Sequence, residues 1–329
     1  MTAAGTKRIV LLTTGGTIAT TTGPDGRSAP TLDPARIAGF AADEALRIES
    51  RELSRVPSWQ LPPEEMARVA LAARDAARAT PDGGVVVTHG TTTLEFTAFL
   101  ADLVLDVDTP VVLTGAMRRA DDPSPDGPAN LRDAIAVAAS LQARGRGALV
   151  VFAGRVVSGH RAWKARRTDA DAFVDLGGDL GHVAGDDVTI TNAVSRPPAF
   201  SGRLETRVRL VKAVPGDDGA LVAVAIEAGA RGLVVEALPG AGGVPPRMAD
   251  ALARAAEGIP VAVTPRAPFG RIDGAPTGGT GEPLRDLDLL APGPLTAEQA
   301  WLLLMAALGD GTDPADARRR FQTAVAAFA

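Results

Sequence analysis

The chain has 329 residues, 46% hydrophobic and 22% charged, with a formal net charge of −5 at pH 7. This length suits one large α/β domain or two medium ones. The mildly acidic charge, spread along the chain, argues against a nucleic-acid partner. The lack of cysteine excludes disulfides and thiolate chemistry. The three histidines, His89, His160 and His182, are too few for a His-rich metal site, so we expect neither a metal nor a cofactor.

The chain shows no sign of a targeting or membrane segment. Its first residues lead straight into an apolar run, without the longer apolar stretch of a signal peptide. No apolar run reaches the length needed to cross a bilayer. We therefore expect a cytoplasmic protein without a membrane partner.

The first apolar run, residues 9–12, predicts a buried parallel strand. It ends in Thr13-Thr14-Gly15-Gly16-Thr17-Ile18-Ala19, where paired glycines allow positive φ and bring backbone N–H groups close to a ligand. The turn matches neither the dinucleotide fingerprint nor a phosphate loop. The proline-rich residues 20–63 are predicted to be irregular, as in a mobile lid or binding loop.

Strand, turn and helix then alternate, which predicts a doubly wound, mostly parallel α/β sheet. A second, smaller α/β domain follows a stretch of hairpins and loops over residues 177–203. We expect a larger domain over residues 1–200 and a smaller one over 207–329. Strands are predicted at residues 84–88, 110–114, 148–152, 208–211, 233–235 and 259–263, and helices at 63–78, 94–105, 130–144, 247–257, 296–308 and 314–328.

Threonines follow three of the predicted strands, at Thr17, Thr91 and Thr114. Because parallel strands point the same way, these segments should meet at one edge of the sheet, where open α/β proteins place their sites.

Several ordered motifs resemble those of the bacterial L-asparaginase/glutaminase family. The resemblance extends from the first strand to the last helices. The matching segments are Thr14-Gly15-Gly16-Thr17-Ile18-Ala19, His89-Gly90-Thr91, Gly115-Ala116-Met117-Arg118, Asp126-Gly127-Pro128 with Asn130-Leu131, and Lys164 seven residues before Asp171-Ala172-Phe173.

The resemblance implies an amidohydrolase with three catalytic residues. Thr17 would attack the side-chain amide, and Thr91 with Lys164 would activate either that attack or the water, while main-chain N–H groups hold the oxyanion. A hydroxyl needs a neighbouring base, and a lysine serves as base only when its neutral form is favoured. We expect the positive charges of Arg161, Arg166 and Arg167 to lower the pKa of Lys164. Substrate-binding residues are expected at Gly16, Ser58, Trp59, Gly90, Thr92 and Ala116.

The sequence departs from the family within the site. Thr92 replaces the aspartate that binds the substrate ammonium and helps to orient the lysine. The chain contains no tyrosine, and Pro30 falls nearest the family's lid tyrosine. Trp59 stands where a polar side chain is usual, and Phe96 stands where a second glutamate is common.

These departures favour an amide or ester substrate whose α-amino group is acylated, cyclised or absent, rather than free asparagine. A catalytically impaired homologue that binds a small ligand or regulates a partner is the main alternative, and a conventional L-asparaginase is a third. Two residues have simpler interpretations: Trp59 could be a lid aromatic packed on a helix, and Thr92 could cap the following helix.

The expected partners are a small-molecule amide substrate and further copies of the chain. The resemblance implies a homodimer or homotetramer in which the neighbour's smaller domain completes each site. Glu282 is a loose match to the glutamate that such a neighbour contributes.

Overall fold

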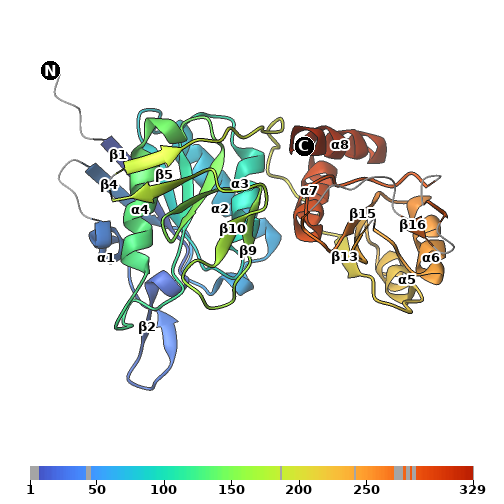
Figure 1. The fold of residues 1–329 in the computed structure, drawn as a ribbon, viewed down its shortest axis with the longest axis horizontal. Coiled ribbons are helices and arrows are strands. Elements are labelled where there is room, and N and C mark those ends of the chain that lie inside the picture. Colours follow the sequence, from blue (N-terminus) through green and yellow to red (C-terminus); the bar gives the residue numbers. More distant parts are fainter. Residues whose placement is uncertain are drawn as a thin grey trace. The chain divides into compact units, whose positions relative to one another are not determined.

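The computed structural model describes residues 7–41, 46–185, 187–240, 242–269, 277–278, 282–283 and 287–328. The chain divides into two compact units, Met1–Val194 and Ser195–Ala329, and each is described by itself (Figure 1).

The first unit is built on one eight-stranded sheet with the order β12-β11-β8-β7-β6-β5-β1-β4. The neighbouring strands β4, β1, β5, β6 and β7 run parallel. The strands β8, β11 and β12 continue the sheet in antiparallel pairing. The sheet is therefore mostly parallel, as predicted. Its strands are β1 (Lys7–Thr13), β4 (Leu46–Glu52), β5 (Gly84–Thr88), β6 (Val111–Thr114), β7 (Ala148–Phe152), β8 (Arg155–Ser158), β11 (Gly181–Ala184) and β12 (Asp187–Ile190).

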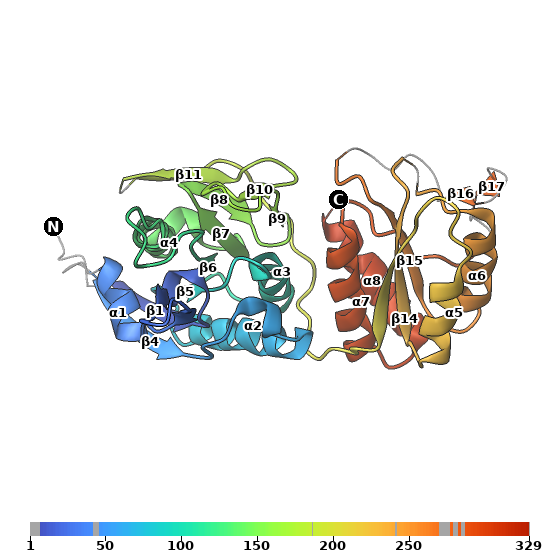
Figure 2. The same cartoon turned by 90° about the horizontal axis from the view of Figure 1, so that it is seen from below.

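Helices cover both faces of this sheet (Figure 2). The helices α1 and α4 lie on one face, where Ile37, Leu131 and Ile135 join the strand residues Leu11 and Val112 in one buried cluster. The helices α2 and α3 pack against each other on the other face. The bounds are α1 (Pro34–Ala38), α2 (Pro63–Arg78), α3 (Leu94–Val104) and α4 (Gly127–Ala139).

Shorter elements connect the strands and helices of this unit. They comprise two hairpins, β2 (Thr20–Thr22) with β3 (Ser28–Pro30) and β9 (Ala162–Lys164) with β10 (Phe173–Asp175), and the short turns η1 (Thr17–Ala19), η2 (Gly39–Ala41), η3 (Ser58–Gln60) and η4 (Leu141–Ala143).

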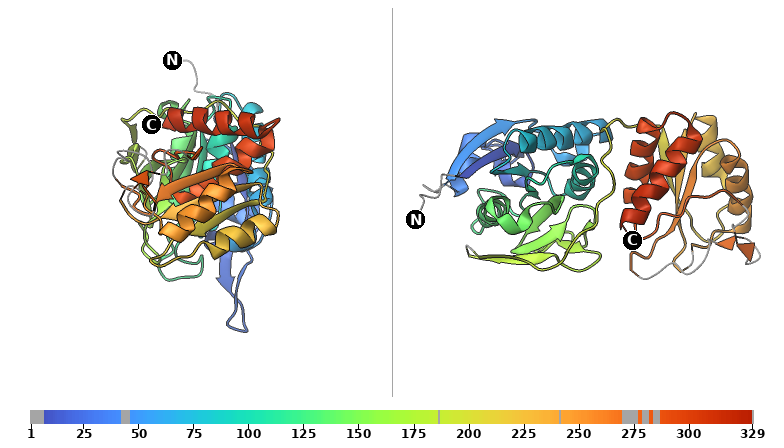
Figure 3. Two further views of the ribbon diagram at one scale, coloured as in Figure 1. Left: turned by 90° about the vertical axis from the view of Figure 1, so that its right-hand side faces the viewer. Right: turned by 90° about the horizontal axis from the view of Figure 1, so that it is seen from above.

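The second unit has a smaller parallel sheet with the order β13-β14-β15. The helix α7 packs on these strands and α8 packs on α7, while α5 and α6 pack together on the opposite side (Figure 3). The bounds are β13 (Val208–Lys212), β14 (Gly232–Ala237), β15 (Val261–Pro265), the paired β16 (Thr277–Gly278) and β17 (Glu282–Pro283), α5 (Ala220–Glu227), α6 (Pro246–Ala256), α7 (Ala297–Asp310) and α8 (Pro314–Phe328).

The prediction that residues 20–63 are irregular is wrong. They contain the β2–β3 hairpin, α1, and β4 as the edge strand beside β1. An edge strand keeps polar side chains, so it lacks the apolar run of a buried strand. Because β4 contains the charged residues Arg47, Glu49 and Arg51, its sequence lacks the pattern that predicts a strand. Glu49 pairs with Arg8 of β1 at 2.7 Å.

Two helices also differ from the prediction. Helix α4 begins at Gly127 rather than Asn130, because Pro128 fits the first turn of a helix, where its missing N–H costs nothing. It ends at Ala139, since Ser140 is extended and begins the short turn η4. Helix α5 was not predicted. Its apolar residues lack a helical period, and Leu221 and Val224 are exposed.

A buried polar cluster joins α3 to the far half of the sheet. Asp102 of α3 accepts the Ala148 N–H at 2.9 Å, and its other oxygen lies 2.7 Å from Nδ1 of His160. The Ser158 hydroxyl lies 2.9 Å from the same nitrogen. All three side chains are buried, so the group is a structural cluster in the core.

We predict that Asp102→Ala lowers the free energy of unfolding by about 3 kcal/mol, because it removes the carboxylate that accepts from a buried N–H and pairs with a buried imidazole. Urea titration measures the change, and Asp108→Ala, at an exposed aspartate four residues beyond the end of α3, should change stability by less than about 0.5 kcal/mol. Equal effects for the two variants would contradict a stabilising role for the cluster.

Candidate active site

The ends of three parallel strands meet at one edge of the first unit's sheet. Thr13 of β1 pairs with Thr88 of β5, which in turn pairs with Thr114 of β6. The pairing continues beyond the strands, because the Thr14 N–H donates to the Thr88 carbonyl at 3.1 Å and the His89 N–H to the Thr114 carbonyl at 2.8 Å. The turns after these strands therefore begin side by side, as predicted. The Thr114 side chain is buried and donates to the Val151 carbonyl. It does not line the cavity described below.

Three of the predicted binding residues lie in close backbone contact. Gly16 has φ 82°, and a Cβ there would lie 2.5 Å from the Cα of Gly90. A Cβ on Gly90 would lie 2.6 Å from the Ser58 Oγ. A side chain at Gly16 would displace the backbone of Gly90, and one at Gly90 would displace the Ser58 side chain, so both positions need glycine. The two glycines thus bring the turn after β1, the turn after β5 and η3 into one site.

A cavity of about 240 Å³ opens where these segments meet. It contains two of the three predicted catalytic residues, Thr17 and Thr91, and five of the six predicted binding residues. Its lining residues are Gly16, Thr17, Thr20, Ser28, Pro30, Pro57, Ser58, Trp59, Gly90, Thr91, Thr92 and Arg119.

The third predicted catalytic residue reaches the cavity through Thr91. The Nζ of Lys164, on β9, donates a hydrogen bond to the Thr91 Oγ1 at 2.8 Å. The Thr91 side chain is buried, and Lys164 is half-buried. Partial burial lowers the pKa of Lys164, because it disfavours the ammonium, and the Glu95 carboxylate opposes this shift. Glu95 also accepts the backbone N–H of Lys164, which fixes the end of β9 against α3.

The prediction that neighbouring arginines lower the pKa of Lys164 is wrong. Arg161 forms an ion pair with Asp175 at 2.7 Å, and Arg166 forms one with Asp171 at 3.0 Å, so carboxylates offset both charges. Arg167 is exposed to solvent. Sequence spacing could show the positive charges but not the carboxylates that face them. Burial is the main cause of the shift.

Ser58 supplies a buried hydroxyl to the cavity wall. Its side chain is 2% exposed, and its Oγ has no hydrogen-bond partner within the part of the chain that the structure describes. The Thr93 hydroxyl donates to the Ser58 carbonyl at 3.0 Å and holds the backbone in place. A buried hydroxyl without a partner is costly, so Ser58 is suited to binding a polar group of a ligand.

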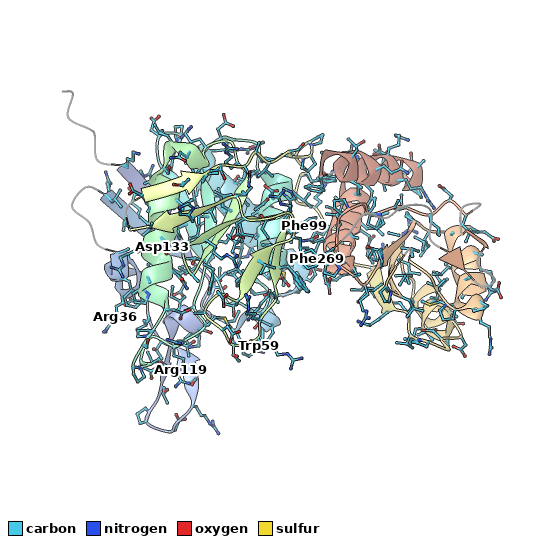
Figure 4. All side chains as sticks on the ribbon, in the orientation of Figure 1. Arg36, Trp59, Phe99, Arg119, Asp133 and Phe269 are labelled. Atoms are coloured by element: carbon cyan, nitrogen blue, oxygen red, sulfur yellow. The ribbon has the colours of Figure 1, made fainter. Side chains whose placement is uncertain are left out.

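Thr92 and Trp59 both face the cavity and are exposed. Thr93, not Thr92, stands at the N-cap of α3, so the interpretation of Thr92 as a helix cap is wrong. Trp59 is 68% exposed (Figure 4), so it is not a lid aromatic packed on a helix. Each side chain is therefore available to a ligand.

Two residues expected within the site, Ala116 and Phe96, lie outside its wall. Ala116 is fully buried in the core beside the start of α4 and does not line the cavity. Phe96 is partly buried on α3 and is also absent from the wall. Sequence order placed both residues near the correct turns but could not show which way their side chains point.

The Asp126 and Asn130 motif fixes the turn after β6. Asp126 accepts the backbone N–H groups of Met117 and Arg118, with its shortest contact at 2.8 Å. The Asn130 amide donates to the Gly115 carbonyl at 3.1 Å and accepts the Ala153 N–H at 3.0 Å. Both side chains hold the turn that leads to Arg119.

The sequence interpretation missed four residues of the wall: Thr20, Ser28, Pro57 and Arg119. Pro30, expected nearest the position of the lid tyrosine, does line the cavity. The proximity of Pro57 to Ser58 was an available signal. Arg119 follows the turn after β6, so its place in the chain could have indicated a residue at the site.

The remaining site expectations concern metal, membrane and the neighbouring subunit. Over the described ranges, no group of three His, Asp or Glu side chains is arranged to hold a metal. Within the same ranges, no helix combines the length and apolar character needed to cross a membrane. Glu282 belongs to β17, but its side chain lies outside what the structure describes.

Comparison with known proteins gives matches over nearly the whole chain. Residues 8–196 match the family model "Asparaginase, N-terminal", and residues 207–321 match "Glutaminase/Asparaginase C-terminal domain". A probable L-asparaginase of Deinococcus radiodurans is 37% identical, covering 97% of this chain and 98% of that protein. An L-asparaginase of Thermococcus kodakarensis is 28% identical with the same coverage. The crystal structure of a probable cytoplasmic L-asparaginase from Campylobacter jejuni superposes with a TM-score of 0.82 at 28% identity, covering 96% of this chain and 99% of that one.

The imidazole of His89, next to the cavity, is completely buried. Its Nδ1 donates to the Gly90 carbonyl at 2.9 Å, so Nε2 accepts from the Thr97 hydroxyl at 3.0 Å. Complete burial lowers the pKa of His89 to about 4. The unfolded chain takes up this proton near pH 6.5, so stability is lost as the pH falls from about 6.5 to about 4.

We predict that this one group removes about 3 kcal/mol of unfolding free energy between pH 7 and pH 4. Urea titrations of the wild type and His89→Gln at several pH values isolate the contribution from that of the carboxylates. The variant should show the flatter dependence, and parallel curves would contradict the prediction.

Proposed function

The chain belongs to the asparaginase family, as its motifs predicted, and we propose that it hydrolyses the side-chain amide of a small substrate other than free asparagine. The observation that carries the proposal is the hydrogen bond from Lys164 to Thr91, beside a cavity that also contains Thr17. A hydroxyl nucleophile, a hydroxyl relay and a lysine of lowered pKa are the groups that amide hydrolysis by threonine needs.

The proposed reaction has two steps. The Thr17 Oγ attacks the amide carbonyl, ammonia leaves, and an ester joins the acyl group to Thr17. Water then hydrolyses the ester and frees the threonine. Neutral Lys164, acting through the Thr91 hydroxyl, accepts a proton from the attacking group in one or both steps. The proton lost by the attacking group is passed to the leaving group, which is the amide nitrogen in the first step and the Thr17 oxygen in the second. The partial burial of Lys164 supports this role, because it favours the neutral amine.

The charges of the cavity support a substrate without an ammonium group. Among the described residues that line the cavity, none is a carboxylate, and Thr92 stands where the family has an aspartate. An ammonium ion here would lose its hydration without gaining a counter-charge from this wall. The exposed Trp59 offers apolar surface in its place. An amide whose α-amino group is acylated, cyclised or absent fits this wall best.

A catalytically impaired homologue that binds a small ligand or regulates a partner is the second candidate. One observation favours it: the chain has no tyrosine, and Pro30 occupies the cavity wall near the position expected for the lid tyrosine. A proline offers no hydroxyl to Thr17.

The cytoplasmic location of the protein and its assembly as a homodimer or homotetramer stay predictions.

Ammonia release from purified protein separates these candidates. The substrates are asparagine, glutamine, N-acetylasparagine and small amides without an amino group. The proposal predicts turnover of acylated or amino-free amides in preference to asparagine. Asparagine as the best substrate would make the protein a conventional L-asparaginase, like its named relatives, and no turnover of any amide would favour the impaired homologue.

We predict that Thr91→Val and Lys164→Met each lower kcat by about 10²–10⁴-fold, the usual contribution of a positioned proton-transfer group. Wild-type activity should rise with pH and level off below the ordinary lysine pKa, because deprotonation of Lys164 creates the base. The same substitution at an exposed lysine of β13, Lys212→Met, is the matched control and should keep the wild-type profile. Full activity in both site variants would exclude the relay.

We predict that Thr92→Asp shifts the substrate preference toward free amino-acid amides. The new carboxylate supplies the counter-charge for an ammonium and repels ligands with an anionic group nearby. The ratio of kcat/KM for asparagine over N-acetylasparagine should rise about tenfold or more. Thr92→Asn controls for shape, because asparagine has nearly the same volume as aspartate but no charge. An unchanged ratio in Thr92→Asp would remove the main support for the altered substrate.

A further inference from the structure

The cavity wall that the described residues form carries a single charged side chain, Arg119. It extends from the loop after β6, and its side chain is 45% exposed (Figure 4). Thr92 and Ser58, on the same wall, are uncharged. The described wall therefore has a positive charge and no carboxylate of its own, and Asp121, outside the wall, offsets part of that charge. This balance favours an anion over an ammonium.

The guanidinium of Arg119 is only partly engaged. Its Nε pairs with Asp121 at 3.3 Å. Within the described ranges its two terminal nitrogens, Nη1 and Nη2, make no hydrogen bond to the protein. These nitrogens provide a fork of N–H donors that matches the two oxygens of a carboxylate.

A backbone hydrogen bond and the Asp121 carboxylate hold the loop that carries Arg119. The Ala120 N–H donates to the Thr20 carbonyl at 3.1 Å, and the Thr22 N–H donates to Asp121 at 2.7 Å. Both bonds fasten the loop to the β2–β3 hairpin. The neighbouring Arg118 points elsewhere, because its side chain donates to Ser124 and does not line the cavity. Arg119 takes part in this anchoring only through its Nε, which pairs with Asp121, and this pairing leaves the two terminal nitrogens of the guanidinium for another partner.

We propose that Arg119 binds a negatively charged group that the substrate carries in place of the α-ammonium, so that the substrate is an acidic amide. The inference deepens the proposed function and rests on it for the amide itself. The cavity then offers two groups suited to anions, the buried Ser58 hydroxyl and the Arg119 guanidinium. An asparagine whose nitrogen is acylated by a dicarboxylic acid has this chemistry, with one carboxylate on the amino-acid carbon and one at the end of the acyl group.

Binding measurements test the role of Arg119 independently of turnover. The full-length Thr17→Ala protein, which should bind without hydrolysis, is titrated by calorimetry with N-succinylasparagine and N-butanoylasparagine. Both ligands have a four-carbon acyl chain, and only the first carries the second carboxylate. The affinities of the two ligands are compared in the Thr17→Ala protein and in double variants that also carry Arg119→Met, Arg119→Lys or Arg118→Met.

The expected result is a tenfold or greater loss of affinity for N-succinylasparagine in Arg119→Met, with little change for N-butanoylasparagine. The preference for N-succinylasparagine over N-butanoylasparagine should be kept in part by Arg119→Lys and in full by Arg118→Met. Added salt should reduce this preference. An equal loss for both ligands would mean that Arg119 only shapes the cavity, and no loss for either would mean that it does not bind substrate. Either outcome overturns the inference.

The same ligands distinguish a failure of this inference from a failure of the proposed function. Wild-type kcat/KM for the two amides is measured by ammonia release. Binding of N-succinylasparagine through Arg119 without hydrolysis of any amide would overturn the proposed hydrolase and leave the anion site standing. Hydrolysis of both amides at equal kcat/KM, with no effect of Arg119→Met, would overturn the anion site alone.

Discussion

The site depends on a lysine amine held against a threonine hydroxyl in a place where water is partly excluded. The Nζ of Lys164 lies 2.8 Å from the Thr91 Oγ1. A fully hydrated lysine would remain protonated and could not accept a proton. Partial burial lowers the pKa of Lys164, and Glu95 limits the shift. The balance between these opposing effects decides whether the cavity beside Thr17 can carry out chemistry at neutral pH.

The fold supplies the remaining positions through backbone geometry. The aligned ends of β1 and β5 place two turns side by side, and glycines at 16 and 90 let those turns touch each other and Ser58. The Asp126 carboxylate holds the turn after β6, from which Arg119 reaches the same cavity. The wall that results has hydroxyls and one positive charge, and its described residues carry no carboxylate. That set of groups suits an anionic amide rather than an amino acid with a free ammonium.

Much of this could be predicted because it depends on local patterns. Apolar runs followed by glycines predicted the parallel strands, and the rule that parallel strands end at one edge predicted that Thr17 and Thr91 share a site. The edge strand β4 could not be predicted in the same way, since its charged residues resemble those of a loop. Helix α5 lacked a helical period because part of its apolar surface is exposed.

Features that depend on the direction of a side chain, or on partners distant in the chain, could not be predicted from the sequence. The sequence showed the arginines near Lys164. It could not show that Asp175, on β10, pairs with Arg161 and offsets its charge. Whether Ala116 faced the cavity or the core depended on how the turn after β6 packs on α4. Arg119 was missed because nothing in its immediate sequence distinguishes it from Arg118, whose side chain lies outside the cavity wall.

The most direct test is to measure the pKa of Lys164 itself. The chain has three lysines, Lys7, Lys164 and Lys212, so NMR of protein labelled with ¹³C at the lysine Cε gives few signals. Lys164→Met assigns the relevant one. The account predicts that the Lys164 signal titrates below the value of about 10.4 found in model peptides, and that Thr91→Val changes its midpoint. A Lys164 signal that titrates at or above that value, unaffected by Thr91→Val, would contradict the account.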